Sequence, residues 1–564
     1  MERTHWYKNA VVYQIYPFSY LDSNNDGMGD IPGIISKLDY IRELGATAIW
    51  FSPLYESPLK DYGYDISDYR KINPAFGTME DFDRLLAECH KRGLKVIMDI
   101  VLNHTSDQHV WFREALKSKD SPYRDYYIIR KGRKKGKKLV PPTNWTSSFT
   151  GSAWERIDGT DEYYLHLFCK EQPDLNWENP KVRAEIFDIL RFYLEKGVDG
   201  FRFDVFNMFS KSYPFKDDKS GALFQKGTMY FVDGPRMHEF LKEMNKEVLS
   251  QFDSYTVGES YQPNEADAYL YVAEKSKELD SIFNFSHLTA DNIGGINFFH
   301  RPFDLPTFKK GLFDAQQKYF NGGWNTLVLE NHDLPRSNCR FGIDTKKYRY
   351  EASTFLAAVT FMGFGIPFIY QGEEIGMTNA DFHSVCEMKD PVSHFVFNLL
   401  RKYNVPRNLA FRLVNNGARD HARVPMQWDN SVNAGFNTGT EPWQRMSNSA
   451  DEINVAKDLA AEKSIYAFYQ KVLKIKKENP IAVRGETFEY DHENRKIIAY
   501  SRNLDGQRLL IIGNFSNDKA HYTLPSEFAP AYLDLLLSNY EDSRIERELH
   551  LRPYEALILQ ARNP

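Results

Sequence analysis

Gly200-Phe201-Arg202-Phe203-Asp204-Val205 is the stretch of sequence that decides the fold. It follows a helical pattern and a short turn, and its apolar residues are typical of a buried strand. Arg202 and Asp204 are two residues apart, so on a strand their side chains point to the same face. A guanidinium beside a buried carboxylate lowers the pKa of that carboxylate and keeps it ionised. An ionised carboxylate at a strand end is a candidate covalent nucleophile. The alternative is a structural ion pair within the strand.

Seven more apolar runs of strand length occur along the chain, and helical patterns separate several of them. The runs are residues 10–17, 46–53, 94–104, 254–260, 281–285, 325–333 and 366–374. Strands that alternate with helices indicate βα units and a parallel sheet. The sequence therefore predicts an α/β fold with a (β/α)8 TIM barrel, whose catalytic residues lie at the C-terminal ends of the strands.

The regular alternation is interrupted after the third strand of the barrel. Residues 105–175 are rich in aromatic side chains and contain a basic run at 130–138, and we expect them to form an insertion domain. We assign residues 1–104 and 176–480 to the barrel. Short alternating strands in residues 481–564 predict a C-terminal antiparallel β-sandwich domain. The basic run is interpreted as a solvated loop in preference to a nucleic-acid site.

Composition and charge narrow the range of functions. The chain has 564 residues and a net charge of −6, which argues against a nucleic-acid binder. Its four scattered cysteines form no CxxC pair, so neither a disulfide framework nor a zinc site is indicated. No signal h-region and no run long enough to span a membrane is found. We expect a cytoplasmic monomer with neither nucleic-acid nor membrane partners.

An acidic loop with a glycine turn follows the first predicted strand. Oxygen ligands at alternate positions are typical of a site for a hard cation. The position eleven residues after Asp22, where an EF-hand needs Glu, holds Gly33, so an EF-hand is excluded. We expect a structural Ca²⁺ or Mg²⁺ site with no part in the chemistry; the alternative is an acidic turn without a metal. The expected metal ligands are Asp22, Asn24, Asp26, the Met28 carbonyl and Asp30.

Several predicted strands end in polar residues, and together these residues suit glycoside hydrolysis. The residues are His104, Asp204, Glu259, His332 and Asp333. Two carboxylates across a glycosidic bond suffice for its hydrolysis. Arg202 would keep Asp204 ionised for attack, and an apolar setting would raise the pKa of Glu259 so that it can donate a proton. The third carboxylate and the two histidines can bind sugar hydroxyls.

The sequence resembles glycoside hydrolase family 13, the α-amylase family, over nearly its whole length. The four motif regions of that family occur in order as Asp99-Ile100-Val101-Leu102-Asn103-His104, Gly200-Phe201-Arg202-Phe203-Asp204, Gly258-Glu259 and Asn331-His332-Asp333. The resemblance implies that Asp204 is the nucleophile, Glu259 the acid/base and Asp333 the stabiliser of the transition state. It also implies retention of the α-configuration through a glucosyl-enzyme intermediate, without a catalytic cofactor.

Within the family, the chain is most similar to the oligo-1,6-glucosidase and dextran glucosidase subgroup. The similarity lies in residues 172–177, 372–377 and 425–429 and in the acidic loop. It implies that Asp61 and Arg423 clamp the hydroxyls farthest from the reacting bond and make the enzyme exo-acting. Val205 matches members that prefer α-1,6 bonds. The residues implied to line the pocket for the terminal glucose are Asp61, Tyr64, His104, Phe149, Phe168, Gln172, Arg202, His332 and Arg423.

Four positions depart from the subgroup. Tyr62 and His421 each stand where Asn is usual, Ser286 replaces a second Glu, and Leu334 stands where many members have Gln. Tyr62 and Leu334 are expected to border the site of the leaving sugar. They leave the substrate open, but not the type of reaction.

The expected function is hydrolysis of the terminal α-1,6 bonds of isomaltose and isomalto-oligosaccharides. Alternatives within the family are a sucrose isomerase, a transglucosidase and a trehalose-6-phosphate hydrolase. The string Arg-Leu-Asp-Arg-Asp, usual in such isomerases, does not occur before the seventh strand. The sequence is also compatible with a phosphosugar enzyme whose cationic pocket for the leaving group is built from the basic run. A non-enzymatic barrel, like the ectodomain of amino-acid transporter heavy chains, ranks below these, since those proteins lack the full acidic set and carry a membrane span.

Overall fold

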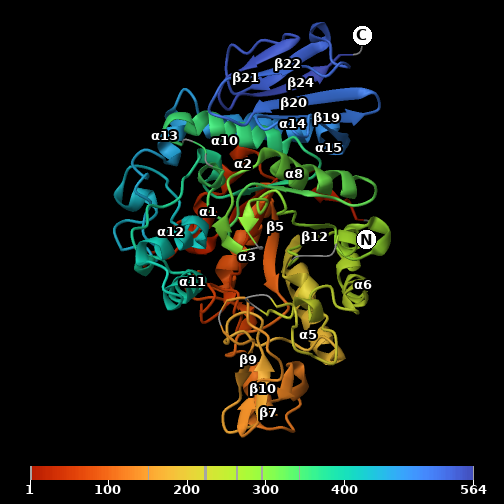
Figure 1. Cartoon of the computed structure of the whole chain (residues 1–564), viewed down its shortest axis with the longest axis vertical. Helices are drawn as coiled ribbons and strands as arrows, with labels where there is room; N and C mark the ends of the chain where they lie inside the picture. The colour runs from red at the N-terminus through yellow and green to blue at the C-terminus, as the bar shows by residue number, and fades with distance from the viewer. Residues whose placement is uncertain are drawn as a thin grey trace. The chain divides into compact units, whose positions relative to one another are not determined.

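The barrel is built on one sheet of eight strands in the order β13-β12-β11-β5-β2-β1-β17-β16 (Figure 1). The eight strands are parallel and form a nearly closed barrel, and each lies within one of the predicted runs. Strands with known burial are buried along almost their whole length, as expected where helices cover a parallel sheet. Their bounds are β1 (Val12–Ile15), β2 (Ala48–Phe51), β5 (Lys95–Val101), β11 (Gly200–Asp204), β12 (Tyr255–Gly258), β13 (Ser281–Ile282), β16 (Thr326–Val328) and β17 (Ile366–Tyr370).

This computed structural model describes residues 3–149, 151–221, 225–261, 265–293, 296–341, 343 and 345–562. The chain divides into two compact units. The first unit comprises Met1–His5, Trp50–Ala87 and Val96–Ile282, and the second comprises Trp6–Ile49, Glu88–Lys95 and Phe283–Pro564. The strands β11, β12 and β13, and β5 from Val96 onward, belong to the first unit, and β1, β16 and β17 belong to the second.

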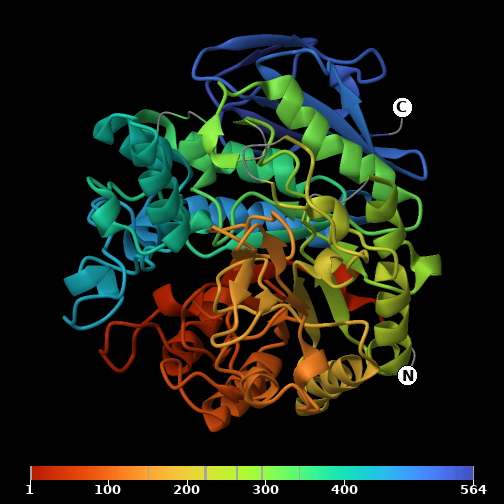
Figure 2. The ribbon, with the colours of Figure 1, turned by 60° about the horizontal axis from the view of Figure 1, so that its bottom comes forward.

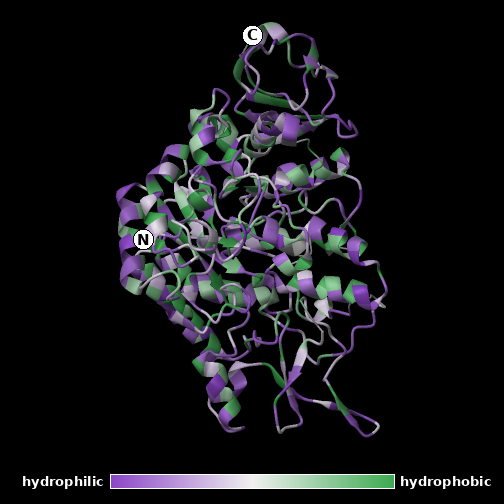
Figure 3. Ribbon diagram, turned by 90° about the vertical axis from the view of Figure 1, so that its left-hand side faces the viewer, coloured by the Kyte–Doolittle hydropathy of each residue, from purple (hydrophilic) through white to green (hydrophobic). Residues whose placement is uncertain are grey.

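The helix before β11 shows how local sequence fixes an element. Helix α5 (Pro180–Lys196) begins at Asn179, whose side chain accepts the Lys181 N–H, and has proline in its first turn. It ends at Gly197, whose φ of 106° is left-handed and suits glycine. The chain then enters β11 at Gly200. Figure 3 shows hydrophilic and hydrophobic residues on the same helices throughout the molecule, the pattern of helices with one covered face.

The insertion after the third barrel strand contains a small antiparallel sheet in the order β6-β10-β9. Its strands are β6 (Ile129–Lys131), β10 (Glu162–Leu165) and β9 (Trp154–Arg156). The basic run was expected to be a loop. Instead it forms the end of β6 and the hairpin of β7 (Arg133–Lys135) and β8 (Lys138–Val140), because two short strands pair around a turn at Gly136, whose φ is positive.

In the second unit, the C-terminal strands form antiparallel sheets in the orders β18-β19-β20-β24-β22 and β21-β23, drawn in blue in Figure 2. Leu510, Leu557, Tyr522 and Leu551 from both sheets share one hydrophobic core. Helix α10 (Thr345–Phe361) contacts β20 and β24. The bounds are β18 (Glu486–Tyr490), β19 (Ile497–Leu504), β20 (Gln507–Asn514), β21 (Ala520–Thr523), β22 (Leu533–Ser538), β23 (Glu548–Leu551) and β24 (Ala556–Ala561).

Two helices lie in the polar stretch that the sequence left without regular structure after the eighth barrel strand. They are α11 (Pro391–Lys402) and α12 (Arg407–Gly417). The Asp390 side chain accepts the Val392 N–H at the start of α11, and Pro391 occupies its first position. The sequence shows this start signal, but the surrounding residues are polar, and no helix was predicted here.

The remaining α-helices are divided between the two units. They are α1 (Ile31–Ser36), α2 (Leu38–Leu44), α3 (Met79–Lys91), α4 (Val110–Lys117), α6 (Met237–Glu247), α7 (Glu265–Val272), α8 (Leu305–Phe320), α9 (Ser337–Arg340), α13 (Val455–Ala460), α14 (Ile465–Glu478) and α15 (Pro480–Arg484). Among the helices in the described ranges, none combines the length and apolar character needed to cross a membrane.

Candidate active site

Arg202 lies in β11 with its side chain buried, and its guanidinium contacts three carboxylates. Its Nη1 donates to Asp99 Oδ1 at 2.8 Å and to Asp204 Oδ1 at 2.8 Å, and its Nη2 donates to Glu259. Arg202 is the register partner of Asp99 on β5, and Glu259 follows the end of β12. One guanidinium therefore holds carboxylates from three neighbouring strands, all within the first unit.

Burial dominates the electrostatics of this cluster. Burial raises the pKa of Asp204 well above its usual range, although Arg202 lowers it. Burial also raises the pKa of Asp99 to about 6, against the effects of Arg202 and Tyr64. The prediction of a lowered pKa for Asp204 was wrong in its net direction, because one buried cation faces three carboxylates and cannot offset their desolvation. Asp99 and Asp204 therefore each bind a proton more tightly than an exposed aspartate would.

Polar residues predicted to bind glucose form a second connected group in the first unit. The Tyr64 hydroxyl donates to Asp99 Oδ2 at 2.9 Å. Gln172 Nε2 lies 3.0 Å from Asp61 Oδ2 and 3.1 Å from His104 Nε2. Burial lowers the pKa of His104 to about 4, so its ring is neutral at pH 7. A neutral imidazole can both donate and accept a hydrogen bond, which suits a sugar hydroxyl.

The aromatic residues predicted for the pocket lie beside these polar groups. The Phe168 ring centroid is 5.1 Å from that of His104 and 5.4 Å from that of Phe149. Val205 joins the same hydrophobic cluster as Phe168. Its φ of 35° is left-handed, which is strained for a β-branched residue. The chain turns sharply there, immediately after Asp204, so that the strand ends at the carboxylate.

The second unit holds a cluster around Asp333, which follows β16. Asp333 Oδ1 accepts from Arg423 Nη2 at 2.8 Å and from Arg419 Nη1 at 3.0 Å, and Oδ2 lies 3.1 Å from His332 Nε2. Arg423 Nε also donates to the His332 carbonyl at 2.9 Å. His332 Nδ1 lies 2.8 Å from Gln14 Nε2. Two guanidinium groups thus fix the orientation of this carboxylate.

Three residues of these clusters were given no role in the sequence analysis, namely Gln14, Asp99 and Arg419. Asp99 stands in the first motif region, and its place opposite Arg202 depends on the register of β5 against β11. Arg419 lies four residues before Arg423, in the short helix Arg419–His421. Arg423 lies beyond the end of that helix, so the spacing of the two arginines in the sequence does not show that both contact Asp333.

Hydrogen bonds within the acidic loop hold it in shape. Asp22 Oδ1 accepts the Asn25 N–H at 2.7 Å, and Oδ2 accepts the Gly27 N–H at 2.8 Å. Asp30 caps α1 by accepting the Gly33 N–H at 2.7 Å. Within the residues that the structure describes, no group of three or more His, Cys, Asp or Glu side chains is arranged to hold a metal.

Comparison with known proteins identifies the family. The model of the α-amylase catalytic domain matches residues 14–485, and that of the α-amylase SusG C-terminal domain matches residues 497–558. An oligo-1,6-glucosidase of Parageobacillus thermoglucosidasius is 47% identical over 569 residues, with 100% of both chains covered. Crystal structures of Bacillus licheniformis trehalose-6-phosphate hydrolase and of the trehalulose synthase MutB from Pseudomonas mesoacidophila MX-45 both superpose with a TM-score of 0.94. The trehalose-6-phosphate hydrolase is 42% identical to this chain, and the match covers 99% of this chain and 100% of that chain. The trehalulose synthase is 38% identical, and the match covers 100% of both chains. The chain is thus a glycoside hydrolase and belongs to the α-amylase family, glycoside hydrolase family 13.

Proposed function

We propose that the chain is a retaining, exo-acting α-glucosidase that hydrolyses terminal α-1,6 bonds of isomaltose and isomalto-oligosaccharides. The observation that carries the mechanism is the contact of one Arg202 guanidinium with both Asp204 and Glu259. It keeps two carboxyl groups within the reach of one glycosidic bond, as a retaining mechanism needs. The 47% identity to an oligo-1,6-glucosidase over the full length supports the proposed specificity for α-1,6 bonds.

The reaction proceeds in two displacements at the anomeric carbon. In the first, a carboxylate oxygen of Asp204 bonds to that carbon while the glycosidic C–O bond breaks, and Glu259 gives its proton to the leaving oxygen. In the second, Glu259 takes a proton from water, whose oxygen bonds to the anomeric carbon and releases Asp204. Each displacement inverts the carbon, so the product keeps the α-configuration. Asp333 supports the positive charge and the distorted ring of the transition state.

The charge of the Arg202 cluster suits the first displacement. Three carboxylates on one guanidinium carry a net negative charge when all are ionised, and burial raises the pKa of Asp99 and Asp204, so the cluster takes up a proton. The mechanism needs that proton on Glu259 and not on Asp204. A positive charge developing on the sugar favours an ionised Asp204, which offsets the effect of burial on its pKa.

We assign the remaining contacts of the terminal glucose to the residues predicted for them. Asp61 and Gln172 are hydrogen-bonded together, and the neutral His104 lies beside Gln172. Arg423 is buried and offers guanidinium N–H donors to hydroxyls. The resemblance to the subgroup assigns Asp61 and Arg423 to the hydroxyls farthest from the reacting bond, and that assignment restricts the enzyme to chain ends.

Trehalose-6-phosphate hydrolysis is the second candidate function. The solved trehalose-6-phosphate hydrolase covers this chain at a TM-score of 0.94 and 42% identity. Tyr62 and Leu334, where the subgroup usually has Asn and Gln, both stand next to proposed site residues in the sequence. The leaving sugar is therefore where the two candidate functions differ.

A panel of isomaltose, panose, maltose, sucrose, trehalose and trehalose 6-phosphate, with products identified, tests the proposal. We expect the highest kcat/KM on isomaltose, with glucose as the product. A higher kcat/KM on trehalose 6-phosphate would replace the proposal with the second candidate. Isomerised disaccharides formed from sucrose would instead indicate an isomerase.

We also propose that the acidic loop binds Ca²⁺ or Mg²⁺ as a structural ion. The donor set of Asp22, Asn24, Asp26, the Met28 carbonyl and Asp30 consists only of oxygens, which hard cations prefer. Such an ion would add to the hydrogen bonds that already hold the loop and take no part in catalysis.

We further propose that the enzyme is a cytoplasmic monomer acting on small oligosaccharides. A mass of 65.8 kDa by light scattering would support the monomer, and twice that mass would refute it.

A further inference from the structure

A cavity of about 500 Å³ in the first unit is lined by residues of the insertion and by residues 213–215, which follow β11. Its lining combines cations with aromatic rings and prolines. The lining residues are Arg130, Lys131, Arg133, Pro142, Tyr213, Pro214 and Phe215. None of these residues takes part in the reaction proposed above.

The aromatic side of this cavity is held rigidly. The Tyr213 and Phe215 rings are stacked, with centroids 4.6 Å apart and an interplanar angle of 27°. Phe215 packs against two tryptophans, since its ring centroid lies 5.0 Å from that of Trp145 and 6.0 Å from that of Trp154. The Trp145 indole N–H in turn donates to the Lys216 carbonyl at 2.9 Å. Tyr213 is 41% exposed, so part of its apolar ring is accessible to a ligand at the surface.

The cationic side comes from β6 and the hairpin. The Arg130 guanidinium lies 5.2 Å from the Tyr213 ring centroid and 5.8 Å from that of Phe215, so cation–π contacts hold it beside the two rings. Arg133 Nε donates to the Pro141 carbonyl at 3.2 Å. In the described part of the chain, its ion pair with Asp217 at 2.9 Å is the one salt bridge of residues 130–138.

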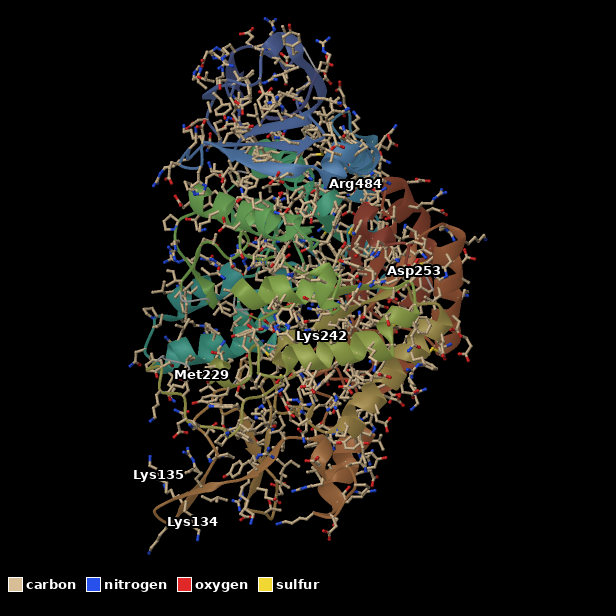
Figure 4. All side chains as sticks on the ribbon, turned by 90° about the vertical axis from the view of Figure 1, so that its right-hand side faces the viewer. Lys134, Lys135, Met229, Lys242, Asp253 and Arg484 are labelled. Carbon is tan, nitrogen blue, oxygen red and sulfur yellow. The ribbon has the colours of Figure 1, made fainter. Side chains whose placement is uncertain are left out.

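The charge of this segment is opposite to that of the molecule. Residues 130–138 contain seven Lys or Arg and no acidic residue, whereas the whole chain carries −6. Figure 4 shows Lys134 and Lys135 at the far tip of the hairpin, pointing away from the body of the insertion. Such a concentration of like charge in one ribbon costs self-repulsion, which an anionic ligand would relieve.

We propose that this cavity binds a phosphate monoester that carries a ring, as a sugar phosphate or a nucleotide does. The guanidinium groups of Arg130 and Arg133, which both line the cavity, bind the phosphate oxygens, since planar arginine donors match phosphate geometry. The ring of the ligand packs on Tyr213, through the C–H face of a sugar or the π-face of a base. A cavity of about 500 Å³ holds one such small molecule.

Isothermal titration of the full-length enzyme with glucose 6-phosphate, AMP and inorganic phosphate tests the proposal. We expect saturable binding of at least one ring-bearing ester, tighter than that of inorganic phosphate. If glucose 6-phosphate binds more tightly than AMP, the site takes sugar phosphates; the reverse order makes it a nucleotide site. Binding that excess glucose displaces would place the ligand in the glucoside pocket and overturn the proposal.

Matched charge variants separate the cavity from general attraction to the hairpin. Arg130→Gln with Arg133→Gln should weaken binding of the ester by about tenfold or more, the effect of losing charge-assisted hydrogen bonds. Lys134→Gln with Lys135→Gln removes the same charge at the tip and should leave the affinity nearly unchanged. Tyr213→Ala should weaken the esters but not inorganic phosphate. Equal losses in the two double variants, or no saturable binding at all, would overturn the proposal.

Discussion

Asp204 ends its strand at a sharp turn and shares the Arg202 guanidinium with two other carboxylates. Replacing it with Asn keeps the shape of the side chain but removes the nucleophilic oxygen. We expect Asp204→Asn to lower kcat on an aryl α-glucoside by at least about 10³-fold, with the fold intact.

Asp199→Asn is a matched control from the other end of the same strand. Asp199 Oδ2 accepts the Val96 N–H at 2.9 Å, and an Asn oxygen can still accept that bond. This variant should keep wild-type kcat. Near-normal activity of Asp204→Asn would refute its role as nucleophile.

Val205 offers a test of linkage preference. Its apolar side chain follows the nucleophile and is buried, and Thr has nearly the same shape with a hydroxyl in place of a methyl group. We expect Val205→Thr to lower the ratio of kcat/KM for isomaltose to that for maltose, because the hydroxyl gives the leaving sugar a polar partner. Val198→Thr makes the same exchange at the start of β11 and should leave the ratio unchanged. If both variants keep the ratio, Val205 has no role in selecting the linkage.

The sequence predicted which types of residue form this site, but not all of the contacts between them. Arg202, Asp204 and Glu259 were expected together and share one set of hydrogen bonds. Asp99 was missed because a strand sequence does not show which residue of the neighbouring strand lies beside it. The net direction of the Asp204 pKa was also missed, since sequence shows the neighbouring charge but not the depth of burial.

At the scale of elements, the acidic loop before α1 makes a prediction about stability. If a hard cation binds there, EDTA should lower the Tm by a few degrees and added Ca²⁺ or Mg²⁺ should restore it, because an ion that binds only the folded state stabilises that state. Asp26→Ala should abolish this response. Asp39→Ala, at an exposed acidic residue of α2, should preserve it. A Tm that is the same with and without EDTA would mean that the hydrogen bonds of Asp22 and Asp30 suffice.

The short helix Arg419–His421 contains a histidine whose burial couples folding to pH. Burial lowers the pKa of His421 to about 4, below the value of about 6.5 for an unfolded chain. The unfolded state therefore binds the proton first, so the contribution to stability is full above pH 6.5 and is lost as the pH falls toward 4. Between pH 6.5 and 4, protonation linked to His421 lowers the free energy of unfolding by at most about 3 kcal/mol.

His421→Asn should flatten the fall in Tm between pH 6.5 and 4 relative to wild type. His383→Asn, at an exposed histidine, is the control and should not change the curve. A wild-type pH dependence in His421→Asn would contradict the predicted coupling.

Elements with a strong hydrophobic pattern were predicted well. All eight barrel strands lie in the expected runs, because a strand buried on both faces is a continuous apolar stretch. Helices α11 and α12 were missed, since their surroundings are polar and only the cap at Asp390 and Pro391 marks the start. The β7–β8 hairpin was missed because its strands are short and their side chains are charged.

At the scale of the whole molecule, the family and the order of the barrel strands follow from the sequence, while the substrate depends on the few residues around the leaving sugar. Family members that match this chain over its full length include an oligo-1,6-glucosidase and a trehalose-6-phosphate hydrolase. Overall similarity therefore identifies the glycosidase, and the residues that differ locally must select the leaving group.

The most direct test of the account is to trap the covalent intermediate with a fluorinated α-glucosyl fluoride that reacts readily but is released slowly, followed by peptide mass spectrometry. We predict one fluoroglucosyl group per chain, attached to Asp204. Attachment to any other residue, or turnover that leaves the enzyme unlabelled under conditions that trap a retaining glucosidase, would contradict the account.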